Sequence, residues 1–135
     1  MVNSETRRKT REPRSADLSA ASALVGAYVA LTVSTLVALV VMSALAPHLA
    51  TQEAWGHAVI VAIFAIVLPL RMRAAQQGRG RALRAVKIIA VALLAVNVVE
   101  AALPHAFPAW MRIEMTATAL MMALLIGLLT RRVRR

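Results

Sequence analysis

The chain has 135 residues, of which 60% are hydrophobic, and a soluble domain of this length leaves too much surface in water to hide so many apolar side chains. The formal charge of +10 does not indicate a nucleic-acid partner, because aromatic residues form only 4% of the chain and offer no surface for base stacking. The absence of cysteine excludes disulfides, thiolate metal sites and thiol redox chemistry.

Four apolar runs are each long enough to cross a bilayer as a helix, at about 18–46, 54–70, 85–103 and 109–130. The first run carries no charge, the second contains Pro69 near its end, and the third stops at Pro104. Short connections between neighbouring spans force those spans to pack antiparallel. The sequence therefore predicts an all-α integral membrane protein with four transmembrane helices in an up-down-up-down bundle, flanked by basic tails at 1–17 and 131–135.

Basic residues fall almost entirely into three clusters that alternate with the apolar runs. The clusters are Arg7, Arg8, Lys9, Arg11 and Arg14; Arg71, Arg73, Arg79, Arg81, Arg84 and Lys87; and Arg131, Arg132, Arg134 and Arg135. Cytoplasmic loops of membrane proteins carry an excess of Lys and Arg. We therefore expect a multi-pass protein of the cell inner membrane with both termini in the cytoplasm, whose basic clusters attract the anionic lipids of the inner leaflet.

Small residues recur every four positions on three of the predicted spans. The first span has Ser22, Gly26, Ala30, Ser34 and Ala38, the second has Ala54, Ala58 and Ala62, and the fourth has Ala119, Ala123 and Gly127. Such stripes let helix backbones approach closely in lipid, so they predict helix-packing faces and make Gly26→Leu and Ala30→Leu disruptive. The chain is rich in alanine, which also produces stripes by chance. A contact face could serve the bundle, a homo-oligomer or a larger membrane complex.

Glu100 is the residue that most needs a partner. Counting from Lys87 at about 1.5 Å per residue places Glu100 about 20 Å across a hydrocarbon core of about 30 Å. A charged side chain within the membrane costs about 2.5 kcal/mol or more and faces the bundle interior or water. Asn97 precedes Glu100 by three residues and shares its helix face.

Several ionisable groups from the other predicted spans lie near the same outer level. They are Glu53, His57, His105, Arg112 and Glu114. One hypothesis is a site for a proton, a cation or, through Arg112, an anionic ligand. The alternative is an interfacial network in which Glu100 or Glu114 pairs with Arg112 and the other groups extend to the headgroups.

The sequence contains no motif that indicates catalysis or cofactor binding. There is no nucleophile motif, phosphate loop or metalloprotease signature, so we expect no enzyme. No two histidines share a close helical spacing, and we expect no metal and no cofactor. Haem with two histidine ligands would need His57 and His105 to face one another, which makes a membrane redox subunit the most distant alternative.

The size and four-span layout resemble those of small multidrug transporters, which carry a membrane-embedded glutamate in the first span. The first span here has no acidic residue between Asp17 and Pro47. Because the first span lacks the glutamate that defines small multidrug transporters, we do not assign the chain to that family. Two function classes follow from the sequence: a non-catalytic accessory or interaction subunit, and a small oligomeric transporter or channel that uses the polar groups around Glu100.

The distribution of basic residues makes a testable prediction about topology. Single cysteines introduced at Asn3, Gln76 and Gln52 should react differently with a membrane-impermeant thiol reagent on intact cells. Only the cysteine at Gln52 should be labelled, because the other two positions lie beside basic clusters that stay in the cytoplasm. Labelling at Gln76 would contradict this topology.

Overall fold

The computed structural model describes the backbone of residues 3–134 and the side chains of residues 17–131, so the remaining side chains of the predicted basic tails lie outside it. Every regular element in the described part of the chain is helical: α1 (Asn3–Leu45), η1 (Pro47–Leu49), α2 (Gln52–Gln76), α3 (Gly80–Ala102) and α4 (Ala109–Arg134). The four α-helices each contain a candidate membrane span, at 17–45, 52–76, 80–102 and 109–131. The prediction of an all-helical protein with four candidate spans is thereby confirmed.

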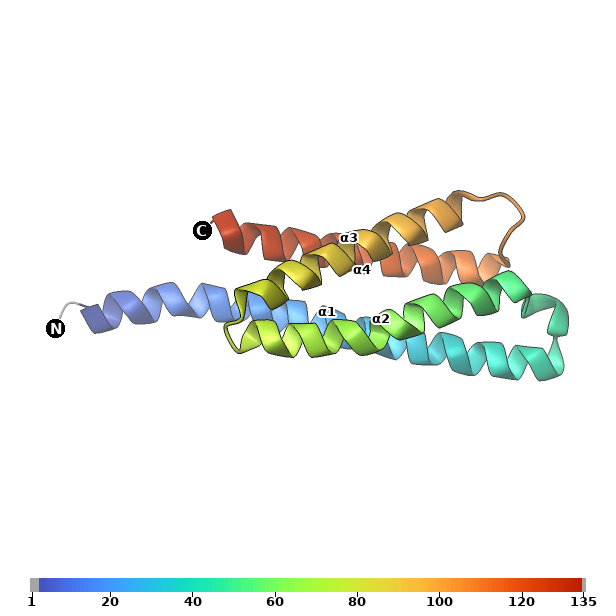
Figure 1. The fold of residues 1–135 in the computed structure, drawn as a ribbon, viewed down its shortest axis with the longest axis horizontal. Helices are drawn as coiled ribbons and strands as arrows, with labels where there is room; N and C mark the ends of the chain where they lie inside the picture. Colours follow the sequence, from blue (N-terminus) through green and yellow to red (C-terminus); the bar gives the residue numbers. More distant parts are fainter. Residues whose placement is uncertain (1–2, 135) are drawn as a thin grey trace.

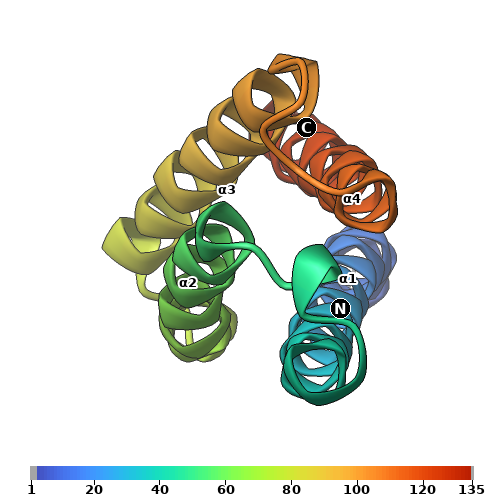
Figure 2. The same ribbon diagram turned by 90° about the vertical axis from the view of Figure 1, so that its right-hand side faces the viewer.

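The two ends of the molecule differ in which connections they carry. The N and C labels and the α2–α3 turn lie at one end, which we call the basic end (Figure 1). The element η1 and the α3–α4 connection lie at the opposite end, which we call the loop end. Contacts join α1 to α2, α2 to α3, α3 to α4 and α4 back to α1, so the helices follow one another around the bundle (Figure 2).

The connection between α2 and α3 is much shorter than the sequence predicts. The prediction placed a loop across 71–84, whereas only residues 77–79 separate the two helices. Arg, Ala and Gln are good helix formers, so each helix continues past its apolar stretch. Gly78 then ends α2 with a φ of +88°, a backbone conformation that glycine adopts without steric cost, and its N–H bonds to the carbonyl of Ala75 at 3.1 Å.

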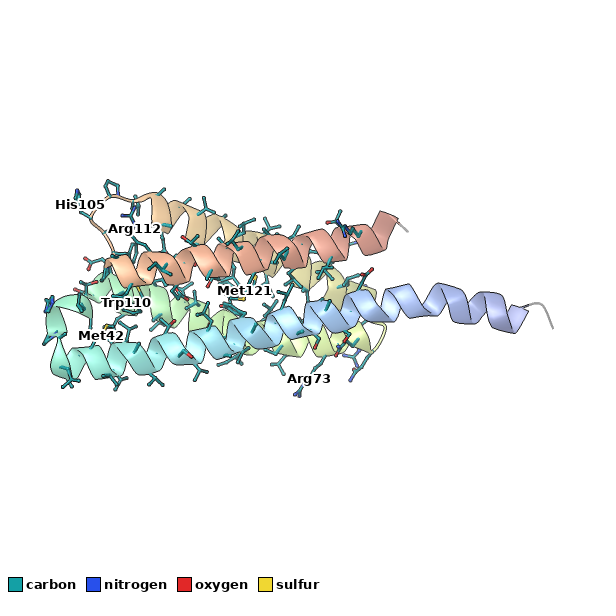
Figure 3. The ribbon with its side chains drawn as sticks, turned by 180° about the vertical axis from the view of Figure 1, so that it is seen from behind. Met42, Arg73, His105, Trp110, Arg112 and Met121 are labelled. Atoms are coloured by element: carbon teal, nitrogen blue, oxygen red, sulfur yellow. The ribbon has the colours of Figure 1, made fainter. Side chains whose placement is uncertain are left out.

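Tryptophan side chains tie the helices together at the loop end. The indole N–H of Trp55 donates to Ser43 Oγ of α1 at 3.3 Å. Trp110, labelled in Figure 3, donates to the carbonyl of Leu49 in η1 at 3.3 Å. Tryptophan is enriched at membrane–water interfaces, and in this fold both side chains also join elements that are not consecutive in the chain.

Buried side chains form two apolar clusters with a polar layer between them. Toward the basic end the core contains Ala21, Val25, Tyr28, Val61, Leu68, Met72, Val86, Ala90, Leu93, Met122, Leu125 and Leu129. Toward the loop end it contains Leu39, Ala54, Ala58, Met111 and Met115. The buried polar residues are Thr32, Thr35, His57, Asn97, Glu114 and Thr118. Along α1, α3 and α4, buried threonine or asparagine residues occupy the stretch between the two clusters.

The outer surface of the bundle is apolar, as a bilayer requires. Only 28 to 33% of the apolar window of each candidate span is buried, so most of these side chains face outward. Large exposed residues occur on all four helices, for example Val37, Ile66, Ile88 and Leu124. Contiguous exposed apolar surface of this extent marks a membrane or protein interaction surface, which fits a protein that spans a membrane.

The predicted small-residue stripes of α1 and α4 lie largely on that outer surface. Gly26, Ala30 and Ser34 of α1 and Ala123 and Gly127 of α4 are exposed, whereas Ser22, Ala38 and Ala119 are half-buried. A Cβ added at Gly26 or Gly127 would meet no atom within 4 Å. Within a single chain, Gly26→Leu and Ala30→Leu therefore create no clash. A role of either stripe in contacts between chains stays a prediction.

Close approach of small residues does occur on α2, which generates a prediction. Ala58 is fully buried in the loop-end cluster, so Ala58→Leu should lower the free energy of unfolding in detergent by about 1–3 kcal/mol through overpacking. The matched control is Ala30→Leu, at an exposed position of α1, which should leave that free energy unchanged. Equal losses for both variants would show that the bundle packs differently.

Candidate functional site

His57 is the centre of the polar layer, and the local sequence places it there. Thr51 caps α2 by accepting a hydrogen bond from the N–H of Ala54 at 3.2 Å. Ala54, His57, Ala58 and Val61 then follow at helical spacing, and all of them are buried. His57 lies about 8 Å along the helix from its start. The imidazole is thereby forced into the bundle, well below the loop end.

Two glutamates from two other helices meet the imidazole on its opposite edges. Nδ1 of His57 contacts Oε2 of Glu100 on α3. Nε2 of His57 lies 3.4 Å from Oε2 of Glu114 on α4. The His57 side chain is 0% exposed, Glu114 is 6% exposed and Glu100 is 20% exposed. Three helices therefore contribute one ionisable group each to a site that is closed except on the side of Glu100.

Two further side chains complete the surroundings of these groups. Thr118, one turn after Glu114 on α4, donates its hydroxyl to Oε1 of Glu114 at 3.3 Å. The ring of Phe107, from the α3–α4 connection, meets the imidazole edge-on, with centroids 6.0 Å apart and an interplanar angle of 68°. We call His57, Glu100, Glu114 and Thr118 the carboxylate–histidine cluster, which Phe107 covers from the loop end.

The cluster needs a proton in each of its two contacts. A neutral imidazole has one N–H donor and one acceptor, and an ionised carboxylate is only an acceptor. If both glutamates are ionised, His57 must be an imidazolium to donate to both. If His57 is neutral, one of the glutamates must carry the second proton. Loss of either proton leaves two lone pairs facing one another, so protonation and geometry are coupled.

Four buried polar atoms in this region have no hydrogen-bond partner among the described residues. They are Thr32 Oγ1, His57 Nε2, Asn97 Oδ1 and Glu114 Oε2, one from each helix. Asn97 uses its amide N–H to donate to the carbonyl of Leu93 at 2.7 Å, which leaves its oxygen unpaired. Buried polar atoms are nearly always satisfied in folded proteins. Two of the four, His57 Nε2 and Glu114 Oε2, face one another at 3.4 Å, which is within ion-pair distance but outside hydrogen-bond geometry.

Polar groups continue from the cluster toward the middle of the bundle and then stop. The hydroxyl of Tyr28 donates to the carbonyl of Val61 at 2.6 Å. Thr32 lies one turn from Tyr28 on the same face of α1. Beyond Tyr28 the buried side chains toward the basic end are apolar, among them Leu68, Met72 and Leu125. The polar interior is therefore confined to the half of the bundle nearer the loop end.

The structure leaves three of the predicted site residues outside the cluster. Glu53 is exposed at the start of α2. His105 is exposed in the α3–α4 connection, where its φ of +64° helps the chain turn after Pro104. Arg112 is exposed and was expected to pair with Glu100 or Glu114. It instead donates from Nε at 3.3 Å and from a terminal nitrogen at 2.9 Å to the carbonyl of Ala101.

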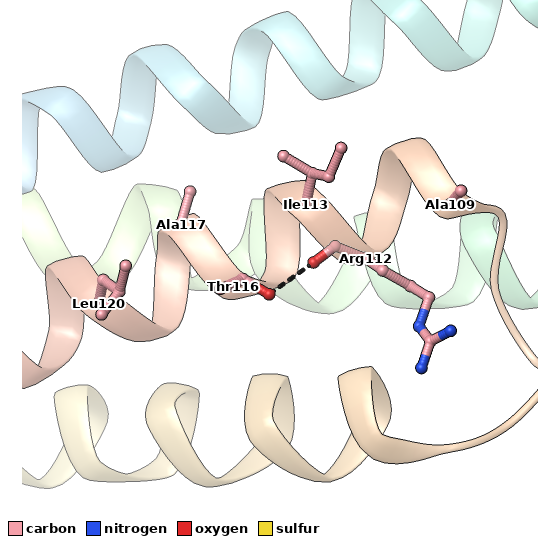
Figure 4. A pocket seen from close by; sticks show the side chains of 6 residues that line it. All are labelled: Ala109, Arg112, Ile113, Thr116, Ala117 and Leu120. Atoms are coloured by element: carbon pink, nitrogen blue, oxygen red, sulfur yellow. Dashed lines mark hydrogen bonds between the residues drawn. The ribbon is translucent and has the colours of Figure 1, made fainter.

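The position of Arg112 has a simple physical reason. The last carbonyls of a helix have no partner within that helix, and the guanidinium satisfies one of them at the end of α3. Figure 4 shows Arg112 extending from the exposed face of α4 toward α3. A groove of about 630 Å³ lies on the same face, lined by Ala109, Arg112, Ile113, Thr116, Ala117 and Leu120. This groove is separate from the buried cluster.

Sequence reasoning missed two members of the site for different reasons. Thr118 lies four residues after Glu114, so the i,i+4 spacing could have identified it as a hydroxyl donor to that carboxylate. Phe107 lies in a connection without regular structure, and nothing in the sequence shows which way its ring turns. Asn97, His57, Glu100 and Glu114 were predicted, and the structure brings the last three into contact.

The positions of the two carboxylates around the imidazole determine what the cluster can bind. Metal ligands converge on one point, whereas Glu100 and Glu114 lie at opposite edges of the imidazole. Within residues 17–131 no group of three or more His, Asp and Glu side chains is arranged to hold a metal ion. The geometry suits the sharing of protons between the imidazole and the two carboxylates.

Comparison of the chain with protein-family models, with curated proteins and with solved structures finds no match. Its function therefore has to be inferred from the cluster itself.

A double-substitution experiment tests the contact between His57 and Glu114. His57→Gln and Glu114→Gln should each destabilise the protein in detergent, because each leaves a buried partner without its proton donor or acceptor. The double variant should lose less than the sum of the single losses, with a coupling energy of about 1–3 kcal/mol. Glu53→Gln serves as the control at an exposed carboxylate. Strict additivity would mean that the two side chains do not interact.

Proposed function

We propose that this chain is a small multi-pass protein of the cell inner membrane, arranged up-down-up-down with both termini in the cytoplasm. The proposal is supported by four apolar helices and by the position of Arg71 to Lys87 around the α2–α3 turn, at the same end as both chain ends. The positive-inside rule assigns that basic end to the cytoplasm. The loop end then faces outward.

We propose further that the protein is a small, non-catalytic oligomeric transporter or channel whose carboxylate–histidine cluster binds and releases protons. One observation carries this proposal: a fully buried imidazole lies between two carboxylates from different helices. Ionisable residues inside the membrane are costly and mark proton relays and ion pathways. Three such groups in contact are more than a four-helix bundle needs for packing.

The charge of the cluster favours the binding of a proton. When fully ionised, two glutamates and one imidazolium sum to a negative charge. No Lys or Arg side chain of the described residues forms an ion pair with the two glutamates, since Arg112 binds the end of α3 instead. A buried charge without a fixed counter-charge is strongly unfavourable. A proton from outside therefore supplies the missing compensation.

Glu100 offers the route by which a proton reaches the cluster. It is the most exposed of the three ionisable groups, at 20%. An open depression of about 360 Å³ lies beside it, lined by Ala95, Val96, Val99 and Glu100 of α3. On the other side, the apolar cluster toward the basic end blocks polar passage. The depression lies on the outward face of α3, since Ala95 and Val99 are exposed. We infer that protons reach Glu100 from the loop end, and passage to the inner side requires the apolar half to open.

A second function, that of an accessory or interaction subunit, is favoured by a different observation. The small residues Gly26, Ala30 and Ser34 are exposed on α1, and such faces pack closely against other transmembrane helices. In that case the cluster only fixes the arrangement of α2, α3 and α4. The two functions differ in whether the cluster exchanges protons with the outside.

Flux measurements in proteoliposomes distinguish the two functions. With a pH-sensitive dye inside the vesicles, the wild-type protein should dissipate an imposed pH gradient. Glu100→Gln and Glu114→Gln should abolish the flux, because each removes a carboxylate of the site. Glu53→Gln, which changes an exposed carboxylate, should retain it. Absence of flux from the folded wild-type protein would overturn the transport function.

Nuclear magnetic resonance of the imidazoles tests the site without any assumption about flux. His57 should gain or lose its proton together with a neighbouring glutamate, so its titration across about pH 5–8 should change in Glu114→Gln. His48 and His105 are both exposed and serve as internal controls in the same sample. An unchanged titration of His57 in Glu114→Gln would remove the proposed sharing of protons.

A further inference from the structure

A third recess lies on the outside of the bundle, between α1 and α2 and toward the basic end. It has a volume of about 300 Å³ and is lined by Ser22, Val25, Gly26, Val29, Pro69, Met72, Arg73 and Gln76. We call it the α1–α2 groove. It is far along both helices from the carboxylate–histidine cluster, which begins at His57 on α2.

The groove exists because both helices carry residues that do not fill the space between them. Gly26 has no side chain, and a Cβ built there would have no neighbour within 4 Å. Ser22 is small, and Pro69 presents a flat ring and no backbone N–H. The volume of the groove is about that of ten water molecules, and a methylene group has a similar volume to one water molecule. The groove therefore has room for the first part of an acyl chain.

The lining changes from apolar to polar along the groove. Val29 of α1 and Pro69 of α2 lie nearer the middle of the bundle. Arg73 and Gln76 lie at the basic end of α2, and both are exposed. Figure 3 shows Arg73 projecting from the bundle near that end. Among the described residues Arg73 forms no ion pair with an acidic side chain. Within residues 17–131 its guanidinium is thus available to an anion at the level of the headgroups.

We propose that the α1–α2 groove is a binding site for an anionic phospholipid of the inner leaflet. The headgroup phosphate binds the guanidinium of Arg73 and the amide of Gln76, and an acyl chain follows Gly26 and Val29 toward the middle of the membrane. Guanidinium groups bind phosphate through paired hydrogen bonds. Basic pockets between transmembrane helices on the cytoplasmic side are suited to anionic headgroups.

Charge complementarity selects this occupant over a neutral lipid or a second copy of the chain. Arg73 attracts a neutral headgroup less strongly than an anionic one. The basic end of a second copy would place further positive charge beside Arg73. Asp17 is an acidic residue near the same end, and it is not part of the lining. The proposal depends on the membrane topology and not on the carboxylate–histidine cluster.

Lipid binding to the full-length protein in a mild detergent tests the site. Native mass spectrometry should detect one tightly bound phosphatidylglycerol and weaker binding of phosphatidylcholine. Arg73→Gln should weaken phosphatidylglycerol binding by roughly fivefold, which corresponds to the loss of one interfacial charge. Gly26→Leu should weaken the binding of both lipids, because the leucine side chain would occupy the groove.

Two matched variants separate a built site from general surface charge. Arg71→Gln removes the same charge two residues from Arg73, outside the lining, and should change the affinity much less. Gly127→Leu adds the same volume at an open position of α4 and should leave binding intact. Equal effects of Arg71→Gln and Arg73→Gln, or equal affinity for the two lipids, would overturn the proposal. Binding of glycerol phosphate as tightly as the whole lipid would also overturn it, because the groove would then contribute nothing.

Discussion

The burial of one imidazole between two carboxylates is the constraint on which the arrangement of this bundle depends. In lipid the helices satisfy their own backbone hydrogen bonds, and apolar side chains gain little by leaving lipid for protein. Polar side chains are different, since in hydrocarbon they have no other partner. His57 on α2 therefore holds Glu100 on α3 and Glu114 on α4 against it. This contact fixes three helices relative to one another.

The same constraint divides the interior of the bundle into two halves with different properties. Near the loop end, the three ionisable groups, Asn97 and the threonines make the interior polar. Near the basic end, the core is built from aliphatic, alanine and methionine side chains, with Tyr28 at its boundary. A proton can be stabilised in the first half and not in the second. Any coupling between the two sides of the membrane therefore requires a change in the packing of the apolar half.

Most acidic and basic side chains of the described residues lie at opposite ends of the bundle. The carboxylates Glu53, Glu100 and Glu114 lie toward the loop end, and the basic side chains from Arg71 to Lys87 lie toward the other end. Asp17, near the basic end, and Arg112, near the loop end, depart from this pattern, and Arg112 satisfies a carbonyl at the end of α3. One end is thus suited to bind protons, and the other is suited to anionic headgroups.

The sequence by itself determined the elements of the fold and the level of the ionisable groups along the helices. Apolar runs of sufficient length specify four helices because a bilayer leaves no alternative for such segments. Depth counted along each run was enough to place His57, Glu100 and Glu114 at a similar level, since helical rise is constant. Helix ends were less well predicted, because Arg, Gln and Ala extend α2 and α3 past the apolar stretches.

Only the tertiary structure decided how each helix is rotated, and rotation determines which side chains meet. The stripe of Gly26, Ala30 and Ser34 looks like a packing face in the sequence, yet α1 turns Ala21, Val25, Tyr28 and Leu39 inward. Arg112 lies at the right depth for Glu100 but points to the end of α3. Depth follows from counting residues along one helix, whereas rotation depends on side-chain packing among all four helices at once. For that reason the sequence predicted the level of the cluster, and the fold selected its members.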